Sequence, residues 1–281
     1  SAKLLLDYLL VVKRLGQLAE GKNGWLRLVK DGRIHGRVNT NGAVTGRCTH
    51  SLPNLAQVPA TRAEYGEECR SLFITKKGYK LVGCDASGLE LRMLAHYLST
   101  WDGGEYSKAI LEGDIHSVNQ KAAGLKTRDQ AKTFIYGFLY GAGDAKLGSV
   151  VGRGRAVGKG LRQRFFDNLP SFKKLTDRVQ REASSGFVKG LDGRKLTVRS
   201  QHAALNTLLQ GAGAIVMKQA LIILNDRIVK HGYDAKFVAN VHDEWQIECD
   251  TDDAVAVGKA GVQAIKEAGC MLKLNCPLDG D

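Results

Sequence analysis

Four side chains between residues 128 and 140 could bind a phosphorylated ligand, because cations and aromatic rings recur there at every fourth position. They are Arg128, Lys132, Tyr136 and Tyr140. At about 3.6 residues per turn, a step of four residues rotates by only about 40° around a helix, so the four side chains share one broad face. Cations one turn apart suit a polyphosphate, which an arginine can bind with two hydrogen bonds. The tyrosine rings offer flat surfaces for a sugar or a base.

The other face of the same segment is apolar and predicts burial against a core. Its members follow the spacing of an amphipathic helix and are Ala131, Phe134, Ile135, Phe138 and Leu139. A surface helix with a solvated basic start and two half-buried tyrosines is the alternative interpretation, since charge on an exposed helix face is ordinary. Spacing alone therefore leaves a ligand site and a plain surface helix both open.

The longer pattern Arg-x-x-x-Lys-x-x-x-Tyr-Gly-x-x-Tyr-Gly, which begins at Arg128, resembles the fingers-helix motif of family A DNA polymerases. The residues around it, from 114 to 144, are similar to those of the replicative polymerases of short-tailed phages. This resemblance implies that Arg128, Lys132 and His116 bind the triphosphate of an incoming nucleotide. It also implies that Lys132 donates a proton to the pyrophosphate leaving group.

The resemblance assigns three further side chains to the sugar and the template. Tyr140 would stack near the templating base, while Tyr136 would frame the deoxyribose together with Glu90. Because Glu90 would crowd a ribose 2′-hydroxyl, this arrangement favours DNA synthesis. An enzyme like the single-subunit RNA polymerases, which have a similar palm and fingers, is the alternative.

A strand that ends in a carboxylate is predicted near residue 85. Residues 79–84 read as a buried strand, and Asp85 follows at its carboxyl end, where a sheet edge opens to solvent. On spacing alone a helix N-cap is the more common role for Asp85. Residues 85–92 closely match the first catalytic motif of family A, which implies that the Asp85 side chain and the Ala86 carbonyl are metal ligands. The same motif implies that Glu90 presses against the sugar pocket.

A second carboxylate is predicted at the tip of a hairpin, where residues 237–240 and 246–249 bracket Val241-His242-Asp243-Glu244. By itself the triplet His242, Asp243, Glu244 fits a zinc site or a solvated turn as well. It matches the second catalytic motif of family A, which implies that Asp243 is a metal ligand. Glu244 would be an auxiliary catalytic carboxylate, and His242 would lie at the DNA.

Two carboxylates on separate elements, Asp85 and Asp243, are the minimum scaffold for nucleotidyl transfer by a two-metal mechanism. Oxygen ligands select Mg²⁺ over zinc, with Mn²⁺ as the alternative ion. The predicted cofactor is therefore a pair of Mg²⁺ ions, about 3.5–4 Å apart.

Further polar residues are candidate DNA contacts: Arg47 and Gln57 in a loop-like segment, and His202, Asn206 and Gln210 at a spacing of four on a predicted helix. Without the resemblance they read as ordinary loop or surface residues. The resemblance implies that Arg47, Gln57 and Gln210 contact the primer–template minor groove. Acceptors that are common to all base pairs lie there, so donors can check pairing geometry without reading sequence.

Charge and composition favour a nucleic-acid partner. The chain has 281 residues with 41 basic and 29 acidic side chains, which gives a net charge of +12 and a pI near 9.4. Such an excess favours a polyanion, nucleic acid before membrane, although a generically basic protein has the same count. We expect no apolar run of membrane-spanning length and no signal peptide, and hence no membrane partner. The six cysteines form no Cys-x-x-Cys pair and read as reduced thiols of a cytoplasmic protein, in the host cytosol if a phage encodes it.

The remaining sequence predicts a series of elements that complete the order along the chain. They are a helix at 2–20, a hairpin of strands 25–29 and 33–39, a helix at 88–98, a flexible basic loop within 146–159, two helices with Pro170 near the start of the second, a hairpin turn at 191–194, a helix at 202–231, a final helix capped by Thr251, and a last strand at 271–275.

The order of elements and the resemblance together predict an α+β fold of the right-hand polymerase type. Residues 1–103 would form the first part of the palm with a remnant of the thumb base helix, 104–187 the inserted helical fingers, and 188–281 the second part of an antiparallel palm sheet. Thumb and exonuclease would be largely absent from this sequence, so a processivity factor or a separate chain could supply them.

The function that these predictions favour is a template-directed DNA polymerase core, with primer–template DNA and deoxynucleoside triphosphates as partners. A catalytically silent piece that only binds primer–template DNA is the second alternative. The presence of both Asp85 and Asp243 speaks against it.

Overall fold

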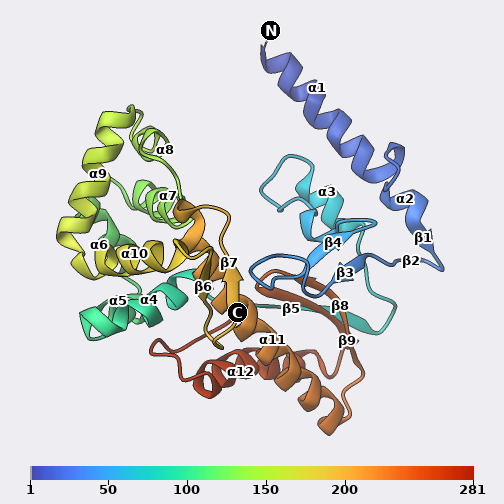
Figure 1. Ribbon diagram of the computed structural model, residues 1–281. Coiled ribbons are helices and arrows are strands. Elements are labelled where there is room, and N and C mark those ends of the chain that lie inside the picture. Colours follow the sequence, from blue (N-terminus) through green and yellow to red (C-terminus); the bar gives the residue numbers. More distant parts are fainter. Residues whose placement is uncertain (1) are drawn as a thin grey trace. The chain divides into compact units, whose positions relative to one another are not determined.

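A computed structural model describes residues 2–281, which fold into two compact units (Figure 1). The first unit comprises the described residues as far as Ala43, together with Arg47–Cys84 and His231–Gly258. The second comprises Val44–Gly46, Asp85–Lys230 and Lys259–Asp281. Both units mix helices with strands, so the α+β content is confirmed.

The centre of the first unit is a three-stranded sheet of order β5-β9-β8. Its strands are β5 (Tyr79–Asp85), β8 (Ala235–Val241) and β9 (Glu244–Asp250), and β8 pairs antiparallel with β9. The turn between β8 and β9 consists of His242 and Asp243, and His242 adopts a positive φ of 57°. The predicted hairpin with a carboxylate at its tip is therefore confirmed.

Strand β5 differs from the prediction in its burial. Of its seven residues only Cys84 is buried, and the others are half-buried or exposed. The reason is its position at the edge of the three-stranded sheet, where it has β9 as its one neighbouring strand. An unbroken apolar run at 81–82 reads as buried from sequence, but an edge strand leaves much of it open to solvent.

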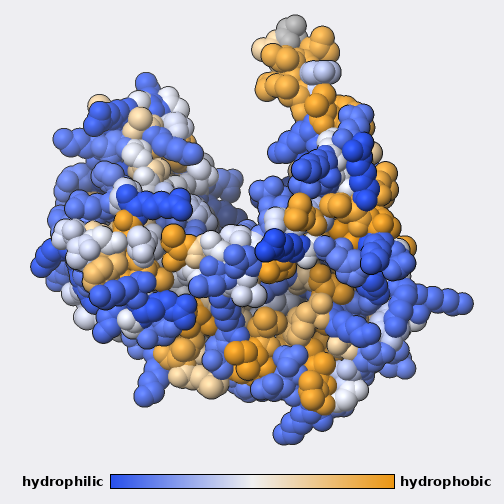
Figure 2. All heavy atoms as spheres, turned by 45° about the vertical axis from the view of Figure 1, so that its right-hand side comes forward, coloured by the Kyte–Doolittle hydropathy of each residue, from blue (hydrophilic) through white to orange (hydrophobic). Residues whose placement is uncertain are grey.

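The amino-terminal part of the first unit is helical as far as Glu20, as predicted, with an α-helix α1 (Ala2–Leu15) that continues into a π-helical segment, Gly16–Glu20. Helix α1 exposes a row of large apolar side chains, which lie in the orange region at the top of Figure 2. They include Leu4, Leu5, Leu6, Tyr8 and Leu9.

The predicted strand at 25–29 is wrong, because Trp25–Leu28 forms a short helix, α2. Trp25 is buried, and its ring meets Phe73 edge-on at 5.1 Å, a contact between distant residues that local propensity does not encode. The hairpin turn itself is confirmed: β1 (Val29–Lys30) pairs with β2 (Arg33–Ile34) across Asp31 and Gly32, both with positive φ.

Small elements complete the first unit between the hairpin and β5. They are β3 (Arg37–Asn39), which pairs with β4 (Thr49–Ser51), the 3₁₀ turn η2 (Leu55–Gln57) and helix α3 (Gly66–Ser71). The segment that the sequence predicts as loop-like thus contains one strand and one helical turn.

Helices α4 to α10 form a body in the second unit, drawn in green to yellow in Figure 1. They are α4 (Leu89–Asp102), α5 (Glu105–Leu111), α6 (Ile115–Ala123), α7 (Arg128–Leu139), α8 (Asp144–Ser149), α9 (Arg155–Asn168) and α10 (Pro170–Ala183). Phe138, Phe165 and Phe172 meet at ring distances of 5.0–5.8 Å and tie α7, α9 and α10 together. Pro170 is the first residue of α10, as predicted.

The predicted flexible basic loop is mostly helical, since α8 and α9 cover all of 146–159 except residues 150–154. Two of its glycines, Gly148 and Gly158, serve close packing. A Cβ built on Gly158 would lie 1.8 Å from the carbonyl oxygen of Asp144 and 2.6 Å from the amide of Gly148. Sequence alone does not separate a glycine needed for flexibility from one needed for close approach.

The second unit continues with the hairpin of β6 (Phe187–Lys189) and β7 (Lys195–Thr197), which turns at Gly193 with a φ of 85°. A 3₁₀ turn, η3 (Gln201–Ala203), leads into the long helix α11 (Ala204–His231), which ends at Gly232. The predicted turn and helix are both confirmed.

The helical stretch Gln201–His231 is long and apolar enough, by length and composition, to cross a membrane, so the expectation that no run would reach that length is wrong. The most apolar window of this helix is 61% buried inside the protein. A core helix of a soluble protein meets the same criterion, and burial accounts for the apolar composition.

The carboxyl-terminal segment departs from prediction at two places. Thr251 does not cap the last helix, α12 (Ala254–Met271); its hydroxyl donates to the Gly78 carbonyl at 2.8 Å instead. The predicted strand at 271–275 does not form. Extended pairing occurs later, where Asp85 and Asp281 exchange backbone hydrogen bonds of 3.0–3.1 Å beside an antiparallel bridge of Ala86 with Gly280.

Candidate functional site

The α7 helix presents the predicted face. Thr127 caps its amino end by accepting a hydrogen bond from the Gln130 amide at 3.2 Å, so the register of the helix is fixed by its first turn. The five side chains predicted to be buried are the five that are buried. Arg128 and Lys132 are exposed, and Tyr136 is half-buried.

Tyr140 lies just beyond the last helical residue, and its amide donates to the Tyr136 carbonyl at 2.9 Å. The spacing of four therefore continues through the helix end. The Tyr140 side chain is 53% exposed.

His116 on α6 interacts with the two cations of α7. Burial lowers the pKa of His116 from its ordinary value, and the charges of Lys132 and Arg128 lower it further. Its Nδ1 atom is buried and has no hydrogen-bond partner among residues 2–281. Over the same residues, the salt bridges include neither Arg128 nor Lys132. The structure thus brings the His116 ring together with two cations that form no salt bridge with a carboxylate of the described chain, which is an environment that favours an anion.

Glu90 on α4 accepts a hydrogen bond from the Tyr140 hydroxyl, at 2.8 Å to Oε1 and 3.1 Å to Oε2. The sequence predicts Glu90 beside Tyr136 and gives no sign of this bond to Tyr140. Glu90 and Tyr140 are 50 positions apart, so no local pattern links them. The bond fixes the phenol of Tyr140 against the first turn of α4.

Backbone contacts order the segment that carries Asp85 and Ala86. Besides the pairing with Asp281, the Ser87 amide donates to the Asp279 carbonyl at 3.0 Å. Arg92, which is buried, donates to the Ser87 carbonyl at 2.7 Å and to the Pro277 carbonyl. Asp85 is itself exposed, whereas Ala86 is buried. The carboxylate is thus held by a fixed backbone and opens to solvent.

The Asp243 carboxylate is paired with an arginine that the sequence analysis assigned to DNA. Nη2 of Arg47 lies 3.1 Å from Oδ1 and 3.4 Å from Oδ2 of Asp243. Burial raises the pKa of Asp243 above its ordinary value, and the nearby Arg47 and His242 oppose that rise. The residues are 196 positions apart, so no sequence signal could have found the pair.

Neighbouring side chains extend this cluster at the β8–β9 turn. Glu244, the first residue of β9, accepts a hydrogen bond from the Gln246 side-chain amide. His242 is exposed. Burial lowers the pKa of His50 from its ordinary value, and electrostatic repulsion from His242 lowers it further.

The remaining predicted DNA contacts lie on two elements. Gln57 is an exposed residue at the end of η2, and its backbone carbonyl accepts from Gln17 at 3.1 Å. His202 is exposed in η3, whereas Asn206 and Gln210 are half-buried on α11. The contact of these residues with DNA stays a prediction.

The donor set of the predicted metal site consists of oxygen atoms, which fits a hard divalent cation such as Mg²⁺. Residues 2–281 contain no group of three or more His, Cys, Asp and Glu side chains arranged to hold a metal. The prediction calls for two carboxylates and one carbonyl, and in the structure Asp243 belongs to the first unit and Asp85 to the second. Whether they share ions stays a prediction.

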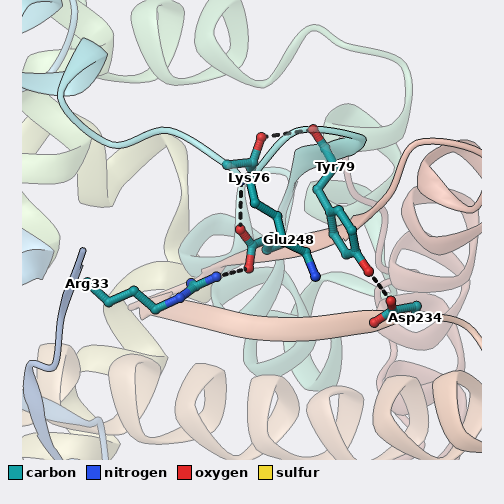
Figure 3. Close-up of polar contacts among 6 residues, drawn as sticks. Arg33, Lys76, Tyr79, Asp234 and Glu248 are labelled. Atoms are coloured by element: carbon teal, nitrogen blue, oxygen red, sulfur yellow. Dashed lines mark hydrogen bonds and ion pairs between the residues drawn. The ribbon is translucent and has the colours of Figure 1, made fainter. Parts of the chain in front are cut away.

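A separate polar network, which the sequence analysis missed, surrounds Glu248 on β9 (Figure 3). Arg33 donates to Glu248 Oε2 at 2.7 Å and the Lys76 amide to Oε1 at 3.4 Å, and these contacts lower the pKa of Glu248. The Lys76 ammonium sits 3.5 Å above the Tyr79 ring, whose hydroxyl donates to Asp234. Both carboxylate oxygens of Glu248 are engaged within the first unit, so this network reads as structural.

Comparison with known proteins agrees with the motifs. The sequence profile of DNA polymerase family A matches residues 2–281. The DNA-directed DNA polymerase of Enterobacteria phage T3 is 48% identical and that of Escherichia phage T7 is 49% identical, each over 307 aligned positions that include 98% of this chain. The chain spans only 44% of the length of each of these two relatives.

A solved structure is similar as well, the POL domain of Pol1 from M. smegmatis in complex with DNA primer-template and dNTP. Its TM-score is 0.80 at 27% sequence identity, over 90% of this chain and 48% of that one. The chain belongs to DNA polymerase family A. Its mixed helices and strands have the fold of a family A polymerase domain.

Proposed function

We propose that this chain is the core of a template-directed DNA polymerase that adds deoxynucleotides to a primer 3′ end. The observation that carries the proposal is the cluster of His116 with two cations, Arg128 and Lys132, which form no salt bridge with a carboxylate among residues 2–281. A triphosphate supplies the missing negative charge. The names of the phage relatives and the DNA and dNTP of the M. smegmatis complex support the same class of activity.

Each residue of this cluster has a role that follows from its chemistry. Arg128 binds phosphate oxygens with two parallel hydrogen bonds, and Lys132 adds a mobile point charge one turn away. Lys132 also donates a proton to the pyrophosphate as it leaves. His116, neutral at pH 7 because its pKa is lowered, contributes a ring N–H as donor.

The sugar and template contacts are assigned to the carboxyl end of α7. Tyr136 frames the deoxyribose, and Glu90 narrows the space that a ribose 2′-hydroxyl would need. Tyr140, which is bonded to Glu90, presents its ring towards the templating base. These assignments favour DNA over RNA synthesis.

Family A polymerases generally use divalent metal ions, and we assign them here to Asp85, the Ala86 carbonyl and Asp243, with Glu244 as an auxiliary carboxylate. Two Mg²⁺ ions bound there, or Mn²⁺ in their place, would supply Lewis-acid activation of the primer 3′ oxygen and positive charge for the triphosphate. The protein's own part is to hold the Ala86 backbone rigid and the carboxylates in place, which the contacts of Ser87 and Arg92 support.

We also propose the right-hand arrangement of a polymerase for this chain. Residues 1–103 and 188–281 would form the palm, and residues 104–187 would form the fingers. Primer–template DNA would meet Arg47, Gln57, Gln210 and their neighbours His202, Asn206 and His242. A further proposed partner is a processivity factor, or a separate chain that supplies thumb and exonuclease functions. The proposed location is the cytoplasm, which is the host cytosol if a phage encodes the protein.

The deciding experiment is primer extension with Mg²⁺ and either deoxy- or ribonucleoside triphosphates. We expect extension with deoxynucleotides only, and none from the Asp85→Ala variant. Extension with ribonucleotides at a similar rate would favour the RNA polymerase alternative. Tight primer–template binding without any extension would favour the catalytically silent alternative.

A further inference from the structure

The ion pair of Arg47 with Asp243 places a cation on a carboxylate that the proposed function assigns to a metal. One nitrogen, Nη2, reaches both carboxylate oxygens, at 3.1 and 3.4 Å. Arg47 comes from the segment just before β4, and Asp243 from the β8–β9 turn, both within the first unit. The Arg47 and Asp243 side chains are 14% and 25% exposed, so the pair is neither fully buried nor fully solvated.

A guanidinium and a divalent ion compete for the same carboxylate. Both are attracted to the oxygen lone pairs, and two cations within about 4 Å of each other repel strongly in a partly desolvated site. A divalent ion therefore binds Asp243 at full strength only after Arg47 has moved away from these oxygens.

A second ion pair in the same unit shows what a structural arginine–carboxylate pair looks like in this protein. Arg33 contacts Glu248 at 2.7 Å, and Glu248 also accepts from the Lys76 amide. Glu248 thus has a close arginine nitrogen on one oxygen and a backbone amide on the other, whereas one nitrogen of Arg47 reaches both oxygens of Asp243 at 3.1 and 3.4 Å. Of the arginine contacts, those of Arg47 with Asp243 are the longer ones, so that pair is the easier one to exchange.

We propose that Arg47 is a latch on Asp243: it holds the carboxylate while DNA is absent, and primer–template DNA releases it for the metal. The inference rests on the proposed function, which brings minor-groove acceptors to Arg47. A guanidinium that donates to base acceptors gives up its bonds to Asp243, so DNA binding and metal binding become positively coupled. Arg47 is a positioning residue in this scheme, because it acts through Asp243.

The test measures Mn²⁺ binding to the whole chain without DNA or nucleotide, from the electron paramagnetic resonance signal of free Mn²⁺. Arg47→Gln removes the charge and keeps a polar side chain of similar length. We expect it to bind Mn²⁺ at the Asp243 site about tenfold more tightly than the unaltered protein, which corresponds to about 1.4 kcal/mol. Arg33→Gln, the matched control that removes the other arginine, should leave the affinity unchanged.

A second arm repeats the titration with saturating primer–template duplex. DNA should tighten Mn²⁺ binding of the unaltered protein about tenfold and that of Arg47→Gln much less, because reciprocal coupling requires the latch. Unchanged or weaker Mn²⁺ binding by Arg47→Gln, or equal tightening by DNA in both proteins, would overturn the proposal. Arg47→Lys, which keeps the charge, should resemble the unaltered protein, and circular dichroism checks that each variant is folded.

Asp243→Asn separates failure of the latch from failure of the proposed function. If Asp243→Asn weakens Mn²⁺ binding but Arg47→Gln does not strengthen it, the latch is wrong and the metal site stands. If Asp243→Asn binds Mn²⁺ as the unaltered protein does, the metal role of Asp243 is wrong, and the latch falls with it.

Discussion

The α7 face and the β8–β9 turn both carry charged side chains, but they differ in whether those charges have a partner of opposite charge within the protein. On α7 and α6 the side chains of Arg128, Lys132 and His116 lie close together, with no carboxylate of residues 2–281 to balance them. At the turn, the carboxylate of Asp243 already has a cation, the guanidinium of Arg47. One region favours an external counter-charge, and the other has an internal one.

This difference determines what a ligand must do in each region. A triphosphate only has to arrive at α7, because the repulsion between the cations is relieved as it binds. The metal ion that we propose for Asp243 would have to replace Arg47, so its net gain in binding free energy would be the difference between two attractions. Substitution of the α7 cations should therefore weaken ligand binding. At the turn, substitution should strengthen metal binding if it removes Arg47 and weaken it if it removes Asp243.

The largest expected effect comes from the carboxylates. Asp243→Ala, and likewise Asp85→Ala, should lower primer extension about 10³-fold or more, because the charge that develops in phosphoryl transfer then loses its counter-ions. Primer–template binding, measured by fluorescence anisotropy, should change little. Asp252→Ala, at an exposed carboxylate of the same unit as Asp243, is the control and should extend normally. Metal-dependent extension at near-normal rate in either variant would remove that carboxylate from the site.

Lys132→Ala should have the next largest effect, about 10²-fold on the extension rate, since it removes both a phosphate contact and the proton donor. Single-turnover rates at saturating nucleotide measure the chemical role, and the nucleotide dependence measures binding. Lys121→Ala removes an exposed lysine from α6 and serves as the control. An equal loss in both variants would mean that general positive charge, rather than the α7 position, is responsible.

The bond from Tyr140 to Glu90 should affect selectivity more than rate. Glu90→Ala should raise ribonucleotide use relative to deoxyribonucleotide about tenfold, a change of about 1.4 kcal/mol. Tyr140→Phe keeps the ring and removes the hydroxyl, so a smaller rise in the same ratio indicates that the bond holds Glu90 in place. A ratio that stays constant in both variants would place the sugar discrimination elsewhere.

The smallest effect is a change in the titration of His116. Its pKa is lowered by burial and by the two cations, so Lys132→Ala should raise it towards the ordinary value. A nuclear magnetic resonance titration of the His116 ring protons measures this, with the His35 resonance in the other unit as the control that should not respond. An unchanged pKa of His116 in Lys132→Ala would show that the two residues do not interact, and a lowered one would contradict the proposed repulsion.

The same shift has a consequence for stability. Because the folded pKa of His116 lies below the unfolded value, the unfolded chain takes up the proton first as the pH falls. His116 therefore contributes stability above about pH 6.5 that is lost at lower pH. In His116→Gln the fall in unfolding free energy between pH 7 and pH 5 should be smaller than in the unaltered protein.

Most of what the sequence predicted correctly depends on local periodicity. The buried face of α7, its exposed cations, the hairpin with Asp243 at its tip, and the start of α10 at Pro170 all follow from spacing and turn chemistry within about a dozen residues. The predictions that failed depend on distant contacts. Trp25 is helical and packs on Phe73, and Gly148 of α8 and Gly158 of α9 allow close packing.

By itself, then, the sequence determined the helix that carries Arg128 and Lys132, the strand that ends in Asp85 and the hairpin with Asp243 at its tip, because each is encoded by neighbours along the chain. Only the tertiary structure decided the partners of the key charges: His116 beside Lys132, Tyr140 on Glu90, and Arg47 on Asp243. Such pairs join residues up to 196 positions apart. Periodicity carries no information over such separations, and the pairing depends on how the burial of each charge is balanced by the groups that the fold brings near it.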